Sequence, residues 1–174
     1  MSELDEAYTA ELESEFDDLR EALLGDTIRI LGPDDPVTAS EGVPVAEAVG
    51  RMMRSRRAAI LIVDADGRLT GIFTERDVLT RVVARGLDPE HTPLGQVMTA
   101  EPEALAVGDR VAYAVNQMSV AGYRTIPLVD SERRPVGVVT VNHIIRWMAT
   151  LFPEAVLNLR PGDALKRPND VDAG

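Results

Sequence analysis

The sequence of 174 residues contains no cysteine, which excludes disulfide bonds and thiolate metal sites. It has no apolar run near the roughly 20 residues that a membrane-spanning helix needs. Histidine occurs only twice, and aromatic residues make up 4% of the chain. Positive charge is also scarce, because 18 Lys and Arg stand against 29 Asp and Glu, for a net charge of −11. Such a chain repels nucleic-acid phosphates and anionic membrane surfaces, so we expect neither as a partner.

The two ends of the chain differ from its middle. The acidic N-terminus lacks the features of a secretory signal, so we expect a cytoplasmic protein. In residues 1–31, apolar residues recur every three or four positions from Leu4 to Leu23, which predicts an amphipathic helix ending near Gly25. This helix could cap its own domain, pair with a second copy or dock on a partner protein. Prolines and glycines predict an irregular tail over residues 153–174.

An internal repeat organises the rest. Shifting the sequence on itself by 66 residues aligns two segments without a gap, for example Gly42 with Gly108 and Asp64 with Asp130. We assign residues 32–91 to a first repeat and residues 92–152 to a second. With only two copies, a solenoid is excluded, and we expect the units to pack face to face about a pseudo-twofold axis.

Each repeat is predicted to run β-α-β-β-α, which makes an α+β fold. Apolar residues at helical spacing follow Pro44, and the continuous apolar run 58–63 predicts a buried strand. Asp66-Gly67 predicts a hairpin turn. The corresponding segment of the second repeat, residues 131–134, has no glycine, so we expect a different turn geometry there. In the closing helices we expect these apolar residues to face inward: Val78, Leu79, Val82, Val83, Ile144, Ile145 and Met148.

The segment from Gly71 to Asp77 is the most informative for function. A strand ends and a helix begins at Thr74, where unpaired backbone N–H groups favour an anion. The Thr74 hydroxyl suits a phosphate or ribose oxygen, and the Asp77 carboxylate can accept hydrogen bonds from two ribose hydroxyls. The same residues also fit a capping box, with a threonine N-cap and an acidic residue at the third helical position. The arginines of residues 51–57 have a similar pair of interpretations, as charges at a helix C-terminus or as phosphate ligands.

The combined pattern resembles the CBS domain family, in which a repeat of about 60 residues occurs twice and ends in strand–Gly-x-x-Thr-x-x-Asp–helix. The resemblance covers residues 33 to 152 and includes the linker Val97-Met98-Thr99. It implies clefts between the repeats that bind AMP, ADP, ATP or S-adenosyl compounds such as S-adenosylmethionine, and pairs that form homodimers. By this resemblance, a first cleft would be lined by Ile72, Thr74, Arg76, Asp77, Thr99, Ala100, Arg124, Thr125 and Pro127.

The second copy of the motif departs from the family pattern, since His143 stands where the ribose-binding aspartate belongs. A neutral imidazole cannot accept two hydroxyl hydrogen bonds as a carboxylate does. This degenerate cleft would be empty or would take a different ligand, and a pH-sensitive role for His143 is an alternative. The resemblance assigns to it Thr38, Ala39, Ala58, Ala59, Thr140 and His143.

Three hypotheses follow. The first is a non-catalytic regulatory module that senses an adenine nucleotide or an S-adenosyl compound, with no required cofactor or metal. The second is a structural dimerisation module with vestigial clefts. The third, an enzyme, has the least support, because the sequence offers no cysteine nucleophile, no histidine cluster and no Walker-type glycine loop.

Overall fold

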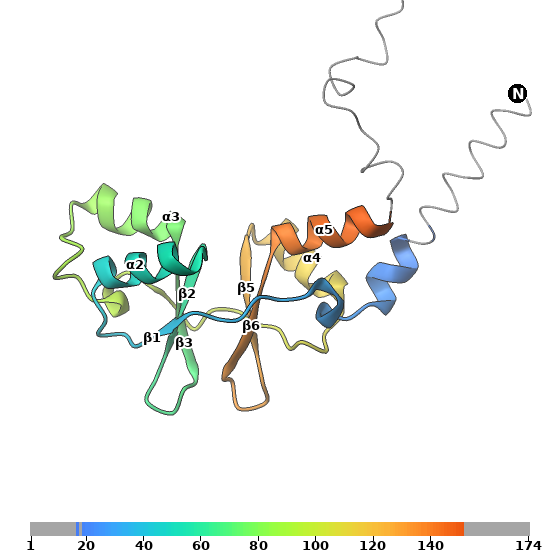
Figure 1. Ribbon diagram of the computed structural model, residues 1–174, viewed down its shortest axis with the longest axis horizontal. Coiled ribbons are helices and arrows are strands. Elements are labelled where there is room, and N and C mark those ends of the chain that lie inside the picture. The colour runs from blue at the N-terminus through green and yellow to red at the C-terminus, as the bar shows by residue number, and fades with distance from the viewer. Residues whose placement is uncertain (1–16, 18, 152–174) are drawn as a thin grey trace, which may run out of the picture.

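The structure is a computed structural model that describes residue 17 and residues 19–151. Figure 1 shows two halves, each with a pair of long strands near the centre and helices on its outer side. The first half holds β1 (Thr38–Ala39), α2 (Val45–Ser55), β2 (Ala59–Val63), β3 (Leu69–Thr74), α3 (Glu75–Asp77), η2 (Val78–Val82) and η3 (Val83–Arg85). The second holds α4 (Val111–Val120), β5 (Thr125–Val129), β6 (Pro135–Thr140) and α5 (Val141–Leu151). This confirms the α+β class and the repeated order of elements.

The two halves match in register as well as in order. Adding 66 to the bounds of β2 and β3 gives the bounds of β5 and β6. Each hairpin also has its irregularity in the same place, between Ile62 and Val63 and between Leu128 and Val129. Equivalent positions can therefore be compared directly between the repeats.

The segment that leads into each repeat pairs with the other repeat. η1 (Ile28–Leu31) precedes the first repeat, and η4 (Leu94–Gln96) and β4 (Thr99–Ala100) precede the second. β4 pairs antiparallel with β3 of the first repeat, placing Ala100 opposite Gly71. Asp34 bridges antiparallel to Val138 of β6, one residue along from Gly137, the position that corresponds to Gly71. A side chain at Gly71 would meet the linker, since a Cβ there would lie 2.3 Å from Met98 Sδ.

Successive side chains of the central strands point to opposite faces, and they contribute to three apolar clusters. Ile60 and Ile62 of β2 pack with α2 residues in the core of the first repeat. Ile126 and Leu128 of β5 do the same in the core of the second. The intervening residues Ala59 and Leu61 face a third cluster that includes Val138 of β6. The strands are therefore buried on both faces, as a continuous apolar run indicates.

The prediction for the closing helices was wrong in part. Val82 and Ile144 are buried, but four of the residues expected to face inward are exposed: Leu79 (65%), Val83 (64%), Ile145 (57%) and Met148 (39%). Trp147 takes an inward position instead, and its indole N–H donates to Asp26 Oδ2 at 3.1 Å. Both faces of these helices are apolar, so spacing alone could not select the buried one.

The expected difference between the two hairpin turns was also wrong. Arg133 adopts φ +64°, close to the +78° of the equivalent Gly67. The side chains of Asp64 and Asp130 accept the same set of turn N–H bonds. The Arg133 side chain contacts both repeats, because it donates to the carbonyls of Leu69 in the first and Pro102 in the second.

The flanking predictions lie mostly outside the described residues. Of the amphipathic helix, residues 19–25 are helical, and Leu19, Ala22 and Leu23 pack against the core of the second repeat. The tail predicted for 153–174 is not among the described residues. Within the described part of the chain, no helix is both long and apolar enough to cross a membrane.

Candidate functional site at the strand–helix junctions

The first junction is a complete capping box. The Thr74 N–H and hydroxyl both donate to Asp77 Oδ2, at 2.9 and 2.7 Å, and the Asp77 N–H donates to Thr74 Oγ1 at 3.4 Å. Asp77 is buried, with only 8% of its surface exposed. The capping interpretation of this segment is therefore confirmed, and the cap holds the Asp77 carboxylate in a fixed place at the end of β3.

Arg81 ties this junction to the linker, and sequence reasoning missed it. Its Nε lies 3.1 Å from Asp77 Oδ1, and its other nitrogens donate to the carbonyls of Val97 and Met98 and to Thr99 Oγ1. Arg81 lies in η2, a π-helical turn with no counterpart in α5. The signal available in the sequence was an arginine one helical turn beyond the motif. The π-helical turn itself is a further indication, because such turns are frequent at functional sites.

The other residues predicted for the first cleft lie on three segments. Ile72 is buried and pairs with Thr99, and both Thr99 and Ala100 are exposed. Arg76 is exposed on α3, and Arg124 is exposed just before β5. Thr125 and Pro127 lie on β5, where they pair with Thr140 and Val138 of their own repeat. Arg81 thus links Asp77 of the capped junction to Thr99, and Ala100 follows Thr99 on β4, where it pairs with Gly71. We name Thr74, Asp77, Thr99 and Ala100 the first site.

The second junction repeats the cap with different chemistry. The Thr140 N–H donates to His143 Nδ1 at 2.9 Å, and the Thr140 hydroxyl lies 3.0 Å from the same atom. Because Nδ1 accepts from a backbone N–H, the neutral ring carries its proton on Nε2. His143 is 1% exposed. An imidazole therefore replaces the carboxylate as the capping acceptor.

A second group that sequence reasoning missed closes this junction. Asp34 Oδ2 lies 2.6 Å from Arg57 NH1 and 3.5 Å from His143 Nε2. The repeat register was the signal that could have found this group, since it aligns Asp34 with Ala100, Arg57 with Tyr123 and His143 with Asp77. We name Asp34, Arg57, Thr140 and His143 the second site.

The remaining residues predicted for the second cleft have other surroundings. Ala39 is buried in the core of the first repeat, and the Thr38 carbonyl accepts from Arg51. Ala59 lies in the apolar cluster between the repeats, and the Ala58 carbonyl accepts from the Glu75 N–H. Among the predicted arginines, Arg51 pairs with Glu47, Arg57 with Asp34, and Arg56 forms the left-handed C-cap of α2.

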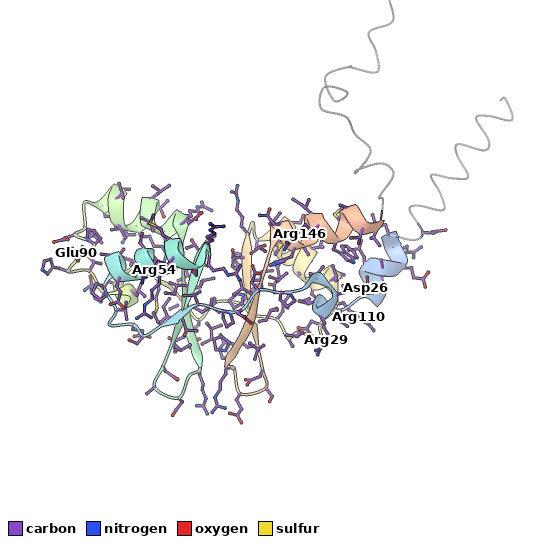
Figure 2. All side chains as sticks on the ribbon, viewed as in Figure 1. Asp26, Arg29, Arg54, Glu90, Arg110 and Arg146 are labelled. Carbon is purple, nitrogen blue, oxygen red and sulfur yellow. The ribbon has the colours of Figure 1, made fainter. Side chains whose placement is uncertain are left out.

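Burial lowers the pKa of His143 below its usual range, and the charges of Arg146 and Arg57 lower it further, while Asp34 raises it. Arg146 lies on α5, in the second half of the molecule (Figure 2). The hydrogen bond from Thr140 to Nδ1 acts in the same direction as burial, because protonation of Nδ1 would remove its acceptor. Burial and this hydrogen bond therefore both favour the neutral form of His143 over the charged form.

These features define a class of protein: a pair of pseudo-symmetric repeats with exchanged linkers and one capped strand–helix junction per repeat. The family model for the CBS domain matches residues 32–84 and 94–150. The chain belongs to the CBS domain family, as its motifs indicated. The matching model describes a CBS domain and not a catalytic one.

Similar proteins agree with this assignment. The CBS domain-containing protein CBSCBSPB2 of Arabidopsis thaliana is 35% identical over 105 residues, 60% of this chain and 20% of that protein. The meiotically up-regulated gene 70 protein of Schizosaccharomyces pombe is 33% identical over 111 residues, 64% of this chain and 15% of the relative. The chain thus spans a fifth or less of the length of these two relatives.

Solved CBS structures share the fold. The CBS domain pair of protein MJ0100, in complex with 5-methylthioadenosine and S-adenosyl-L-methionine, has a TM-score of 0.65 and 25% identity over 72% of this chain and 97% of that one. A CBS domain protein from Pyrobaculum aerophilum, complexed with AMP, has a TM-score of 0.64 and 23% identity over 72% and 99%.

Proposed function

We propose that this chain is a non-catalytic regulatory module that binds an adenine nucleotide or an S-adenosyl compound at the first site. The observation that carries the proposal is the buried Asp77 carboxylate, fixed by Thr74 at the end of β3 and linked through Arg81 to the exposed Thr99 of β4. The adenosine-containing ligands of the similar structures support this class of ligand.

The first site offers one group for each part of such a ligand. The two oxygens of Asp77 suit the two ribose hydroxyls, since an ionised carboxylate is an acceptor only. The Thr74 hydroxyl and the guanidinium of Arg81 or Arg124 suit a phosphate. The ribose hydroxyls would replace Thr74 and Arg81 as hydrogen-bond donors to Asp77. Arg81 would then also change its contacts to the linker.

The test is calorimetric titration of AMP, ADP, ATP and S-adenosylmethionine into the wild type and into Asp77→Asn. Asparagine retains an acceptor for the Thr74 N–H, so the cap is kept while the charge is lost. We expect saturable binding of at least one compound, weakened at least about tenfold in the variant, because hydrogen bonds to a charged group contribute about 1.5–3 kcal/mol. His143→Asn is the matched control and should leave this binding unchanged. Absence of binding by all four compounds in folded protein would contradict the proposal.

We further propose that the module is a homodimer joined through its helical faces. Exposed apolar side chains gather on the outer helices of both repeats: Met53, Leu79, Val83, Tyr113, Val120, Ile145 and Met148. A hollow of about 560 Å³ between α2 and η2 is lined by Val49, Met53, Val78 and Leu79, among others. Large exposed apolar patches mark association surfaces.

Sedimentation of Leu79→Glu tests this assembly, with Thr80→Glu as the control at the next exposed position. We expect a dimeric wild type and control and a monomeric Leu79→Glu variant. A monomeric wild type would overturn the dimer proposal. The expected cytoplasmic location stays a prediction.

A further inference from the structure

The second site contains two nitrogen donors close to a single oxygen. Arg57 NH1 and His143 Nε2 lie 2.6 and 3.5 Å from Asp34 Oδ2. The buried His143 Nε2 has no hydrogen-bond partner, since 3.5 Å with this geometry leaves it unpaired. An unpaired buried donor is unfavourable, so this atom would gain from a closer acceptor.

The backbone fixes Asp34 in this position. Its N–H donates to the Val138 carbonyl at 3.0 Å, and its carbonyl accepts from the Val138 N–H at 2.9 Å. The carboxylate is therefore delivered by the linker to the end of β6, where a ligand would meet the motif of the second repeat. In the 66-residue register the linker residue equivalent to Asp34 is Ala100, which has only a methyl group and pairs with Gly71.

We propose that Arg57 and His143 form an oxyanion subsite at the second site, and that Asp34 occupies it as an internal anion. In the intact chain this subsite is filled, so free oxyanions do not reach the two donors. Removal of the Asp34 carboxylate would leave a guanidinium and an Nε2–H group free to bind a phosphate or carboxylate group of a ligand. The proposal concerns the second site alone and does not depend on nucleotide binding at the first.

The experiment is a titration of inorganic phosphate into the full chain, observed through the imidazole ¹H–¹⁵N NMR signals. The sequence has only two histidines, and His91→Gln assigns the signals by removing one of them. We expect the His143 Nε2–H signal of the wild type to be insensitive to phosphate. In Asp34→Ala it should shift saturably, with an affinity at least about tenfold higher than the wild type shows.

Asp35→Ala is the matched control, since it removes the same charge from the adjacent, exposed position. Asp35→Ala should behave as the wild type. This result would distinguish the loss of the Asp34 carboxylate from the subsite from a general decrease in the repulsion between the acidic chain and phosphate. Asp34→Asn, nearly isosteric, provides a second variant if Asp34→Ala does not fold. A saturable wild-type response of His143, or a folded Asp34 variant with no response, would overturn the proposal.

Discussion

The two strand–helix junctions have the same backbone and different chemistry. In the first, a carboxylate from the motif caps the helix and the linker contributes a small, exposed alanine. In the second, an imidazole caps the helix and the linker contributes a carboxylate paired with Arg57. A cap is present at both junctions. We infer that three pairs of equivalent positions decide which site can accept a ligand: 34 and 100, 57 and 123, and 77 and 143.

The largest effect on stability is expected at the position of the closing helices where the two repeats have the most different side chains. Position 147 is a buried tryptophan in the second repeat, and the equivalent Arg81 makes polar contacts in the first. Trp147→Ala should lower the free energy of unfolding by about 3–5 kcal/mol, as large aromatic-to-alanine changes in a core do. Arg81→Ala should cost less, because its side chain is about one-third exposed. Urea denaturation of both variants measures the difference, and equal losses would contradict the assignment of Trp147 to the core.

A carboxylate placed in the first site should close it. Ala100→Asp gives the first site the carboxylate that Asp34 provides at the equivalent position of the other linker, and a second negative charge there repels both Asp77 and a ligand phosphate. We expect nucleotide affinity to fall at least about thirtyfold, since like charges in contact cost several kcal/mol. Ala100→Asn is the uncharged control. Calorimetry that finds similar losses in both variants would attribute the effect to size and not to charge.

The opposite exchange should open the second site. Asp34→Ala with Arg57→Tyr and His143→Asp gives the second site the residues of the first. We expect the number of nucleotides bound per chain to rise from one to two, provided that circular dichroism shows an unchanged fold. An unchanged stoichiometry in the folded variant would mean that other residues exclude the ligand.

A smaller effect is expected at the hairpin turns. Arg133 and Gly67 share a left-handed conformation, which costs roughly 1–2 kcal/mol in a residue with a side chain. Arg133→Gly relieves this strain and Arg133→Ala does not, although both lose the contacts to Leu69 and Pro102. The glycine variant should therefore be more stable than the alanine variant by about 1 kcal/mol in thermal or urea unfolding. A more stable alanine variant would show that the turn relaxes when the arginine is removed.

The smallest effect is a dependence of stability on pH. His143 faces Asp34, Arg57, Arg146 and Thr140, and its pKa is lowered in the folded state, chiefly by burial. The stabilisation from its neutral form is complete above about pH 6.5, the ordinary histidine pKa, and is lost as the pH falls from there toward the folded pKa. The exposed His91 contributes with the opposite sign, because its bond to Asp88 raises its pKa. In a His91→Gln background, His143→Asn should remove the histidine part of the slope below pH 6.5, and an unchanged slope would contradict this assignment.

Much of the fold could be predicted from the sequence, because the repeat and the apolar alternation are local patterns. Residues 58–63 and the 66-residue register located β2 and β5, and the family motif located both junctions. The resemblance implied that Thr99 and Ala100 lie against the first motif, and β4 does pair with β3. It did not imply the bridge of Asp34 to Val138, which joins residues about a hundred positions apart. Arg81 and Asp34 belong to no motif, and only the pairing of linker with strand shows what they contact. The buried face of α5 was missed because Ile145 and Trp147 are both apolar.

The central claim is that one site of the two accepts a nucleotide. Calorimetric titration of the wild-type chain with AMP, and then with the other three compounds, measures the stoichiometry directly. The account predicts one molecule of a binding compound per chain, lost in Asp77→Asn and kept in His143→Asn. Two molecules per chain would contradict the closed second site, and none with any compound would contradict nucleotide binding at the first.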